Sequence, residues 1–94
     1  MDPIDTKRIY RLVGRLMLKP DGDVTLAFDP ETLAVHQLNP TLARVAELLD
    51  GQRPTEQVVI ALSESLEIGV DDASREVYRA LQALRSEQLI EACG

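Results

Sequence analysis

The stretch LAVHQLNPTLARVAELLDG (residues 33–51) contains the one clear change of character in this sequence. Before Asn39 the chain shows short stretches with strand-like, period-two features, and after it apolar residues recur at helical spacing. Asn39 is a favoured helix N-cap, and Pro40 suits the first helical position because the amide it lacks has no partner there. The chain is therefore expected to pass from strands to helices at this point.

The residues upstream of this stretch predict three short antiparallel strands. PDGD (20–23) and DPET (29–32) are turn sequences, because proline presets φ and Asp and Gly tolerate the conformations that follow. They separate partly alternating segments over residues 11–19, 24–28 and 33–38. Tight turns between successive strands favour a meander, in which the first and third strands are the edges.

Three helices are expected downstream, each with an apolar stripe along one face. Gly51 is expected to end the first helix and Gly69 the second. Thr55 is the expected N-cap of the second, and Asp71 or Asp72 that of the third. The predicted buried residues are Leu42, Val45, Ala46 and Leu49, then Val58, Val59, Leu62 and Leu66, then Ala73, Val77, Leu81 and Leu84, with Leu89 and Ile90 folding back onto the bundle.

The predicted fold is α+β, with a three-stranded antiparallel sheet followed by a three-helix bundle in the order β-β-β-α-α-α. The chain of 94 residues is long enough for one compact domain and too short for two. We expect a flexible N-terminal arm over residues 1–9 and a single domain over residues 10–92.

Composition and charge restrict the class of protein. The sequence has neither an apolar run long enough to cross a bilayer nor the apolar segment of a signal peptide, and its single cysteine, Cys93, suits a reducing compartment. A cytoplasmic location without membrane contact is therefore expected. The net charge is −6, and the only basic excess lies in residues 1–19, with five basic against two acidic side chains. Nucleic-acid binding is disfavoured because no helix offers a basic face.

No constellation of residues predicts catalysis. His36 is the only histidine, and no nucleophile with an orienting acid accompanies it in a recognisable motif. A zinc site needs clustered Cys and His, which the sequence lacks, and there is no glycine-rich phosphate loop. The expectation is a protein that is not an enzyme and that needs neither metal nor cofactor.

The third predicted strand is unusual for a sheet edge. Edge strands are normally protected by charge, especially Lys, or by Pro. The first strand carries Arg11, Arg15 and Lys19, whereas residues 33–38 contain neither a formal charge nor proline. Such an edge either accepts another strand through main-chain hydrogen bonds or is covered by the final helix or a tail.

Several segments of the chain resemble the PqqD-like family. They are Leu38-Asn39, then LLDG (48–51), then Arg53-Pro54-Thr55, and finally Asp71-Asp72 with the helix leading to QLI (88–90). The resemblance covers roughly residues 10–91. Two positions depart from the family pattern: Pro54 separates Arg53 from Thr55, and His36 stands where an aromatic residue is frequent.

The resemblance implies a specific function. Such domains, also called RiPP recognition elements, have a winged-helix-like fold and bind the leader segment of a ribosomally made precursor peptide, which a partner enzyme, often of the radical SAM class, then modifies. The leader adds as a strand beside the third strand, in a groove walled by the third helix. The peptide-binding residues expected on this basis are Leu33, Ala34, Val35, His36, Gln37 and Leu38 in the strand, and Tyr78, Leu81, Gln82 and Arg85 in the helix.

Two questions stay open at the level of sequence. A one-residue change of register exchanges the faces of a strand, so either Val35 or His36 faces the groove. Two other functions also remain: a winged-helix DNA-binding regulator, supported by the fold type and the basic N-terminal arm, and a structural homodimer that pairs two third strands. The expected state is a monomer or a weak homodimer.

Overall fold

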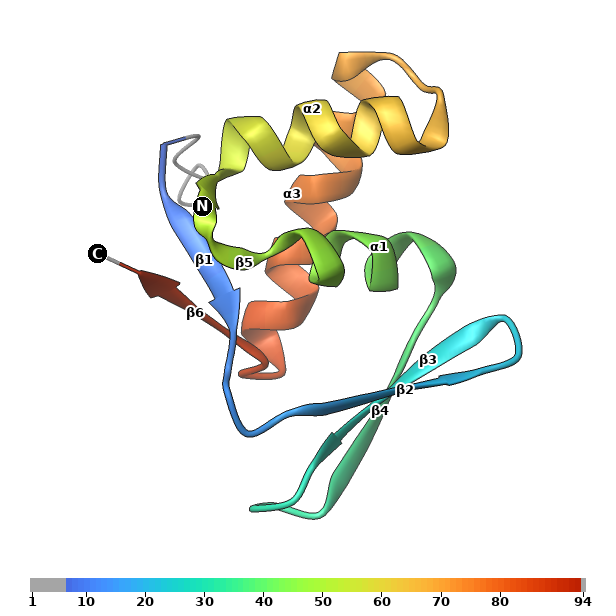
Figure 1. The fold of residues 1–94 in the computed structure, drawn as a ribbon, viewed down its shortest axis with the longest axis vertical. Coiled ribbons are helices and arrows are strands. Elements are labelled where there is room, and N and C mark those ends of the chain that lie inside the picture. Colours follow the sequence, from blue (N-terminus) through green and yellow to red (C-terminus); the bar gives the residue numbers. More distant parts are fainter. Residues whose placement is uncertain (1–6, 94) are drawn as a thin grey trace.

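The computed structural model describes residues 7–93, which form six strands and three helices (Figure 1). The strands are β1 (Ile9–Leu12), β2 (Met17–Asp21), β3 (Val24–Asp29), β4 (Ala34–Leu38), β5 (Asp50–Pro54) and β6 (Ile90–Cys93), and the helices are α1 (Pro40–Leu48), α2 (Thr55–Leu66) and α3 (Val70–Ser86). The α+β class is confirmed. The predicted order β-β-β-α-α-α is wrong, because β5 lies between α1 and α2 and because β1 and β6 add strands at the two ends.

The strands form two antiparallel sheets instead of one, in the orders β5-β1-β6 and β2-β3-β4. The single strand predicted over residues 11–19 is divided between them. The chain turns between β1 and β2, where the Leu16 N–H donates to the Val13 C=O at 3.2 Å and the Val13 N–H donates to the Leu89 C=O at 3.0 Å. The alternation of apolar and polar residues continues through this turn, so the sequence pattern did not show that one strand ends and another begins there.

The two strands that the sequence did not predict form by pairing with β1. In β5, the sequence DGQRP is poor in strand-forming residues, yet Arg11 lies opposite Asp50 and Ile9 opposite Pro54. All four residues of β6 pair with β1. β5 and β6 are strands because they pair with β1, which is distant in sequence. The strand propensity of their own residues does not predict such pairing.

The two predicted turns of the second sheet are confirmed. Asp21 pairs with Val24, so Gly22 and Asp23 alone connect β2 to β3, and Gly22 adopts the positive φ of +63° that such a hairpin turn requires. The next turn extends one residue further than expected. Leu33 has a φ of +64°, and its N–H donates to the Asp29 C=O at 2.7 Å, so it belongs to the loop and not to β4.

The predicted start of α1 is confirmed, but its end is not. The Asn39 side chain accepts a hydrogen bond from the Leu42 N–H at 2.8 Å, and Pro40 is the first helical residue. The helix ends at Leu48, earlier than predicted from Gly51, because Asp50 and the residues that follow pair with β1. Gly51, with a φ of +80°, is a strand residue here.

The predicted boundaries of α2 and α3 need correction. Thr55 is the first residue of α2 and not its cap; its hydroxyl donates to the Arg8 C=O at 2.8 Å and so ties the helix to the segment before β1. α2 ends through Glu67, which has a φ of +54°. Gly69 precedes α3 as its N-cap, and the predicted cap residues Asp71 and Asp72 lie in the first helical turn.

The arm predicted over residues 1–9 is only partly within the described part of the chain. Residues 1–6 lie outside the described residues. Ile9 is the first residue of β1, and the Arg8 C=O accepts hydrogen bonds from Thr55. The segment from residue 8 onward is therefore attached to the domain.

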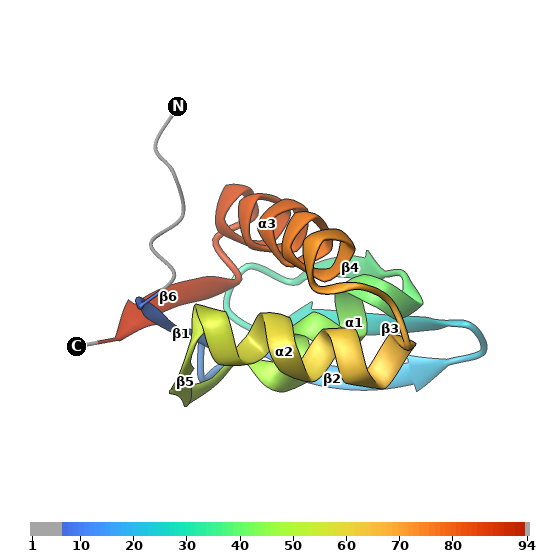
Figure 2. The ribbon, with the colours of Figure 1, turned by 90° about the horizontal axis from the view of Figure 1, so that it is seen from above.

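One core joins the helices to the inner face of the second sheet. Most residues of the predicted stripes are buried, but Leu42 is only partly buried and Leu66 is exposed. Leu89 and Ile90 fold back into the core as expected, and Ile90 then begins β6. Seen from above, α3 lies next to β4 (Figure 2). The packing therefore brings the last helix to the edge of the second sheet.

Candidate functional site

β4 is an edge strand in the described part of the chain. It pairs with β3 on one side, and none of the other strands in residues 7–93 pairs with its other side. The sequence left open whether the final helix or a tail covers this edge. The last helix, α3, lies beside β4, but no strand within residues 7–93 pairs with its outer side, and we call this side the open edge of β4.

The pairing of β2 with β3 shows which backbone groups of β3 point toward β4. In antiparallel pairs, hydrogen-bonded and non-hydrogen-bonded residue pairs alternate. Pro20 faces Thr25 and has no amide, so this pair is of the non-hydrogen-bonded type. The same phase follows from the two-residue turn, which Asp21 and Val24 close as a hydrogen-bonded pair. Thr25 and Ala27 therefore direct their N–H and C=O groups toward β4.

The free backbone groups of β4 follow from this phase. Leu38 and His36 lie opposite those two β3 residues, so their own N–H and C=O groups pair with β3. Val35 and Gln37 alternate with them and direct their N–H and C=O groups to the open edge. Two donors and two acceptors are thus available to an added strand.

The side chains of β4 alternate in the same way. Val35 is 58% exposed and Gln37 is exposed, and both lie on the outer face of the sheet. Leu38 is buried, and His36 is half-buried with its Nδ1 atom 3.6 Å from the Glu87 Oε2 atom at the end of α3. The structure thereby answers the question of register: His36, and not Val35, carries the side chain that faces the last helix.

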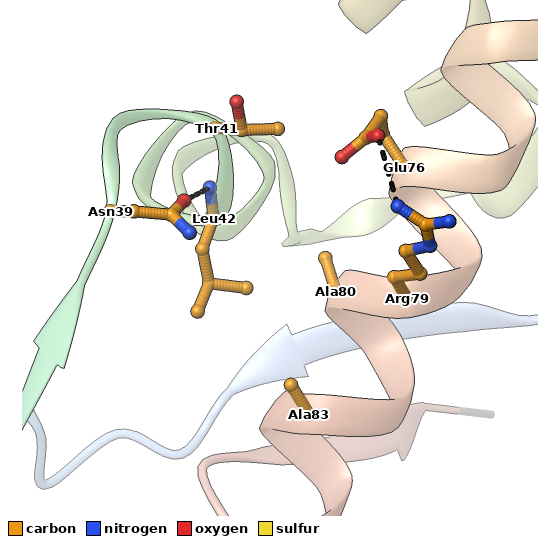
Figure 3. Close-up of a pocket in the computed structure, with 7 residues that line it drawn as sticks. All are labelled: Asn39, Thr41, Leu42, Glu76, Arg79, Ala80 and Ala83. Atoms are coloured by element: carbon orange, nitrogen blue, oxygen red, sulfur yellow. Dashed lines mark hydrogen bonds and ion pairs between the residues drawn. The ribbon is translucent and has the colours of Figure 1, made fainter.

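A groove runs between β4 and α3, with Leu42 of α1 at its floor; we call it the β4–α3 groove. Toward the N-terminal half of α3 it continues into a second depression, and the two share Leu42 and Ala83 (Figure 3). Small side chains, Ala80 and Ala83, form much of the helix wall. The residues lining the first part are Val35, His36, Gln37, Leu38, Leu42, Ala83, Leu84, Glu87 and Leu89. Those lining the second are Asn39, Thr41, Leu42, Glu76, Arg79, Ala80 and Ala83.

The groove is apolar in the middle and charged toward its ends. Leu38, Leu42 and Leu84 contribute the apolar surface near Ala83. At one end Glu76 and Arg79 form an exposed ion pair of 3.7 Å, and at the other Glu87 stands beside His36. An extended peptide with apolar side chains on one face fits such a surface better than a small polar ligand does.

The structure places the ten predicted binding residues in different surroundings. Four of them line the β4–α3 groove, namely Val35, His36, Gln37 and Leu38. Leu33 lies in the preceding loop, 74% exposed, and Ala34 begins β4 beside it. Their part in binding remains a prediction.

The four predicted residues of α3 do not line this groove. Leu81 is completely buried in the core. At 3.6 residues per turn, Tyr78, Gln82 and Arg85 lie roughly 100–160° around the helix from Ala83. The apolar stripe of a helix has two flanks, and the prediction chose the flank with the larger polar residues. Packing instead turned the flank with Ala80 and Ala83 toward the start of α1 and, at Ala83, toward β4.

Residues of the groove that the sequence reading missed include Ala83, Glu87 and Leu89. Glu87 is 51 positions from His36, so no local pattern connected them. The run of small residues on one flank of the stripe was the one available indication, since close packing of a helix against a strand edge favours small side chains.

A buried acid stabilises the loop that leads into β4. Both carboxylate oxygens of Asp29 lie 3.0 Å from the Arg15 Nε atom, and one accepts a hydrogen bond from the Glu31 N–H at 2.9 Å. Burial by itself raises the pKa of the Asp29 carboxyl, but these hydrogen bonds and the Arg15 charge outweigh it and hold the pKa below its ordinary value of 3.8. Asp29 is therefore ionised and connects the β1–β2 turn to the start of β4.

The described residues contain neither a metal-binding cluster nor a membrane-spanning helix. No group of three or more His, Cys, Asp or Glu side chains in residues 7–93 is placed to hold a metal ion. None of the helices in that range combines the length and apolar character needed to cross a membrane.

Comparison with protein families and solved structures gives a consistent result. The model of the PqqD family, described as coenzyme PQQ synthesis protein D, matches residues 25–90. No curated protein matches the chain.

Three solved structures are similar in fold. TbiB1 in complex with the TbiA(beta) leader peptide has a TM-score of 0.72 and 18% identity, covering 86% of this chain and 94% of its own. Lasso peptide synthetase B1 complexed with its leader peptide has a TM-score of 0.73 and 20% identity, covering 87% and 96%. The PqqD truncation of Methylobacterium extorquens PqqCD, described as a stand-alone RiPP recognition element, has a TM-score of 0.77 and 18% identity, covering 95% of both chains.

Proposed function

This chain belongs to the PqqD family, and on that premise we propose that it is a RiPP recognition element: a non-catalytic adaptor that binds the leader segment of a ribosomally made precursor peptide and presents it to a modifying enzyme. The leader adds to β4 as a further antiparallel or parallel strand, and its inward side chains enter the β4–α3 groove. Two of the structures similar in fold contain a leader peptide, which supports this reading.

The observation that carries the proposal is the open edge of β4 beside a groove. Val35 and Gln37 offer main-chain donors and acceptors at that edge, and Leu38 and Leu42 offer apolar surface next to it. Main-chain pairing supplies affinity that does not depend on sequence, and the pockets that receive alternate side chains supply specificity. A recognition module needs both.

The partner enzyme belongs to the proposal as well. The family resemblance points to a maturase, often of the radical SAM class, that receives the bound precursor. In this proposal the chain needs no catalytic group. It holds the precursor peptide close to the modifying enzyme and so raises the peptide's effective concentration there, and the enzyme performs the reaction.

The same open edge supports a second candidate function, a homodimer in which two β4 strands pair across a two-fold axis. Pairing of that kind and leader binding compete for the backbone groups of Val35 and Gln37. Size-exclusion mass measured over a range of concentrations, with and without peptide, separates them: a leader that dissociates a dimer shows that both use β4.

The deciding experiment is a calorimetric titration with leader segments of short precursor peptides, combined with amide hydrogen exchange. We expect binding to slow exchange at Val35 and Gln37, whose amides face the open edge, while the amides of β2 exchange as before. Protection confined to β2, or to the β5-β1-β6 sheet, would show that the leader binds elsewhere. A separate titration with random duplex DNA at low salt tests the alternative of a DNA-binding regulator. A regulator should bind the duplex under these conditions, and the proposed adaptor should not.

A further inference from the structure

The geometry of β4 determines which residues of an added strand enter the groove. Residues directly opposite each other in a sheet lie on the same face. His36 and Leu38 carry their side chains on the groove side of β4, so the two residues paired with them point into the groove as well. These two residues are two positions apart, which is about 6.7 Å along a strand.

The helix wall presents two different environments at the same spacing. Ala83 lies beside Leu38 and Leu42, and Glu87 lies beside His36. Glu87, the C-cap, follows Ala83 by four positions, a rise of about 6 Å along the axis. The two spacings are similar, so a strand that runs along α3 would place one inward residue near each of the two environments.

The first environment is apolar and has room for a large side chain. Leu38 and Leu84 are almost completely buried and form a fixed floor, whereas the apolar surface accessible to a ligand comes from the partly buried Leu42 and the exposed Ala83. Ala83 contributes only a methyl group to the wall (Figure 3). A large apolar side chain placed here removes apolar surface from water on both partners, which favours binding.

The second environment is acidic. Glu87 caps the C-terminal end of α3, where the helix dipole adds negative potential to that of the carboxylate. Its nearest cationic candidate is His36 at 3.6 Å, which carries charge only when protonated. Arg85 is in the last turn of α3 but exposed on the flank that faces away from the groove, and among the described residues it forms no ion pair with Glu87.

Resting on the proposed function, we infer that the segment accepted by β4 carries a large apolar residue and, two positions from it, a lysine or arginine. The apolar residue occupies the space between Leu42 and Ala83, and the basic residue pairs with Glu87. The spacing is the same whether the segment runs parallel or antiparallel to β4, because in both directions every second side chain points toward the groove.

The inference can be tested without knowing the natural precursor. A display library of random nine-residue peptides is selected against the full chain, and the enriched peptides are checked by amide exchange for protection of Val35 and Gln37. We expect Leu, Ile, Phe or Tyr to recur with Lys or Arg two positions away. The best peptide and its Lys→Gln analogue then serve as probes in calorimetric titrations.

Variants of the two environments identify the residues responsible. In the unchanged protein the Lys peptide should bind about threefold more tightly than its Gln analogue, as expected for a partly exposed ion pair. Glu87→Gln should abolish this difference, and the matched control Glu64→Gln, an exposed position on α2 outside the groove, should preserve it. Ala83→Leu should weaken both peptides about tenfold by filling the apolar space, and Ser74→Leu, on an exposed part of the same helix, should not.

The outcomes separate the inference from the function on which it rests. Selection of peptides that protect β4, without a basic preference or with a preference unchanged by Glu87→Gln, overturns the inference and leaves the proposed function standing. Failure to select any peptide that protects β4 overturns the proposed function, and the inference with it.

Discussion

The two edges of the sheet β2-β3-β4 differ in their charge and in the backbone groups that they offer to another chain. At the β2 edge, Leu18 and Pro20 are the residues whose backbone groups face outward, and Pro20 has no amide to offer. Lys19 lies between them. At the β4 edge, Val35 and Gln37 face outward with complete backbone groups and no formal charge.

The comparison shows how one small sheet keeps a single edge available. Proline and lysine are two of the usual devices that prevent edge-to-edge association. They occur on β2, whose five residues are all exposed, and are missing from β4, which has the groove beside it. We read the difference as selective protection, in which the unprotected edge is the one with side-chain pockets to recognise its partner.

The largest effect is expected from proline at the inward position of β4. His36→Pro removes an amide that pairs with Ala27 of β3 and leaves a buried carbonyl unpaired, at a cost of about 2–3 kcal/mol in the free energy of unfolding. Val35→Pro removes an amide that faces the open edge and should cost much less. Urea unfolding of both variants measures this; an equal loss of stability would show that the assigned phase of the β3–β4 ladder is wrong.

The second prediction compares the two outward edges in binding. Val35→Pro should weaken a peptide that protects β4 by about tenfold, because one main-chain hydrogen bond is lost and the proline ring meets the incoming strand. Leu18→Pro makes the same change at an outward position of β2 and serves as the matched control. Calorimetric titration of both variants is the measurement, and equal weakening by the two would remove the distinction between the edges.

A smaller effect is expected where the β1–β2 turn is coupled to the start of β4. Arg15→Ala removes the partner of Asp29 and should lower the thermal midpoint, whereas Arg44→Ala, which breaks an exposed pair with Glu47, should not. Because the pKa of Asp29 is depressed in the folded state, its ionised form stabilises the fold fully above pH 3.8. That stability is lost as the pH falls through the lower folded pKa.

The difference between the unchanged protein and Arg15→Ala should therefore stay constant in neutral and mildly acidic buffer and shrink below pH 3.8. Thermal unfolding over a pH series gives this profile. A difference that persists unchanged in strong acid would assign the effect to packing of the Arg15 side chain instead of its charge.

The smallest effect is expected from removing the protection of β2. The double change Lys19→Thr with Pro20→Val restores an outward amide and deletes the charge, so β2 becomes an edge of the β4 kind without a groove beside it. We expect a modest rise in self-association with concentration, read by size-exclusion chromatography with light scattering. An unchanged mass at high concentration would mean that twist or exposure, and not these two residues, protects the edge.

Local sequence was sufficient wherever the structure depends on neighbours in the chain. The Asn39 cap, the Gly22 hairpin turn and the unprotected character of residues 33–38 were all readable, because caps, turns and edge protection depend on the chemistry of a few adjacent residues. The buried stripe of α3 was readable too, since helical periodicity states which residues share a face.

What the sequence alone did not determine involves partners that are distant along the chain. β5 is a strand because β1 lies beside it, and for the same reason α1 ends before Gly51. The rotation of α3 about its axis, as its stripe is buried, decides which flank of the helix meets β4. As a result Ala83 and Glu87 line the groove, and Tyr78 and Arg85 do not. Periodicity places a helix face toward the core, but only the packing of the other elements decides what lies on either side of that face.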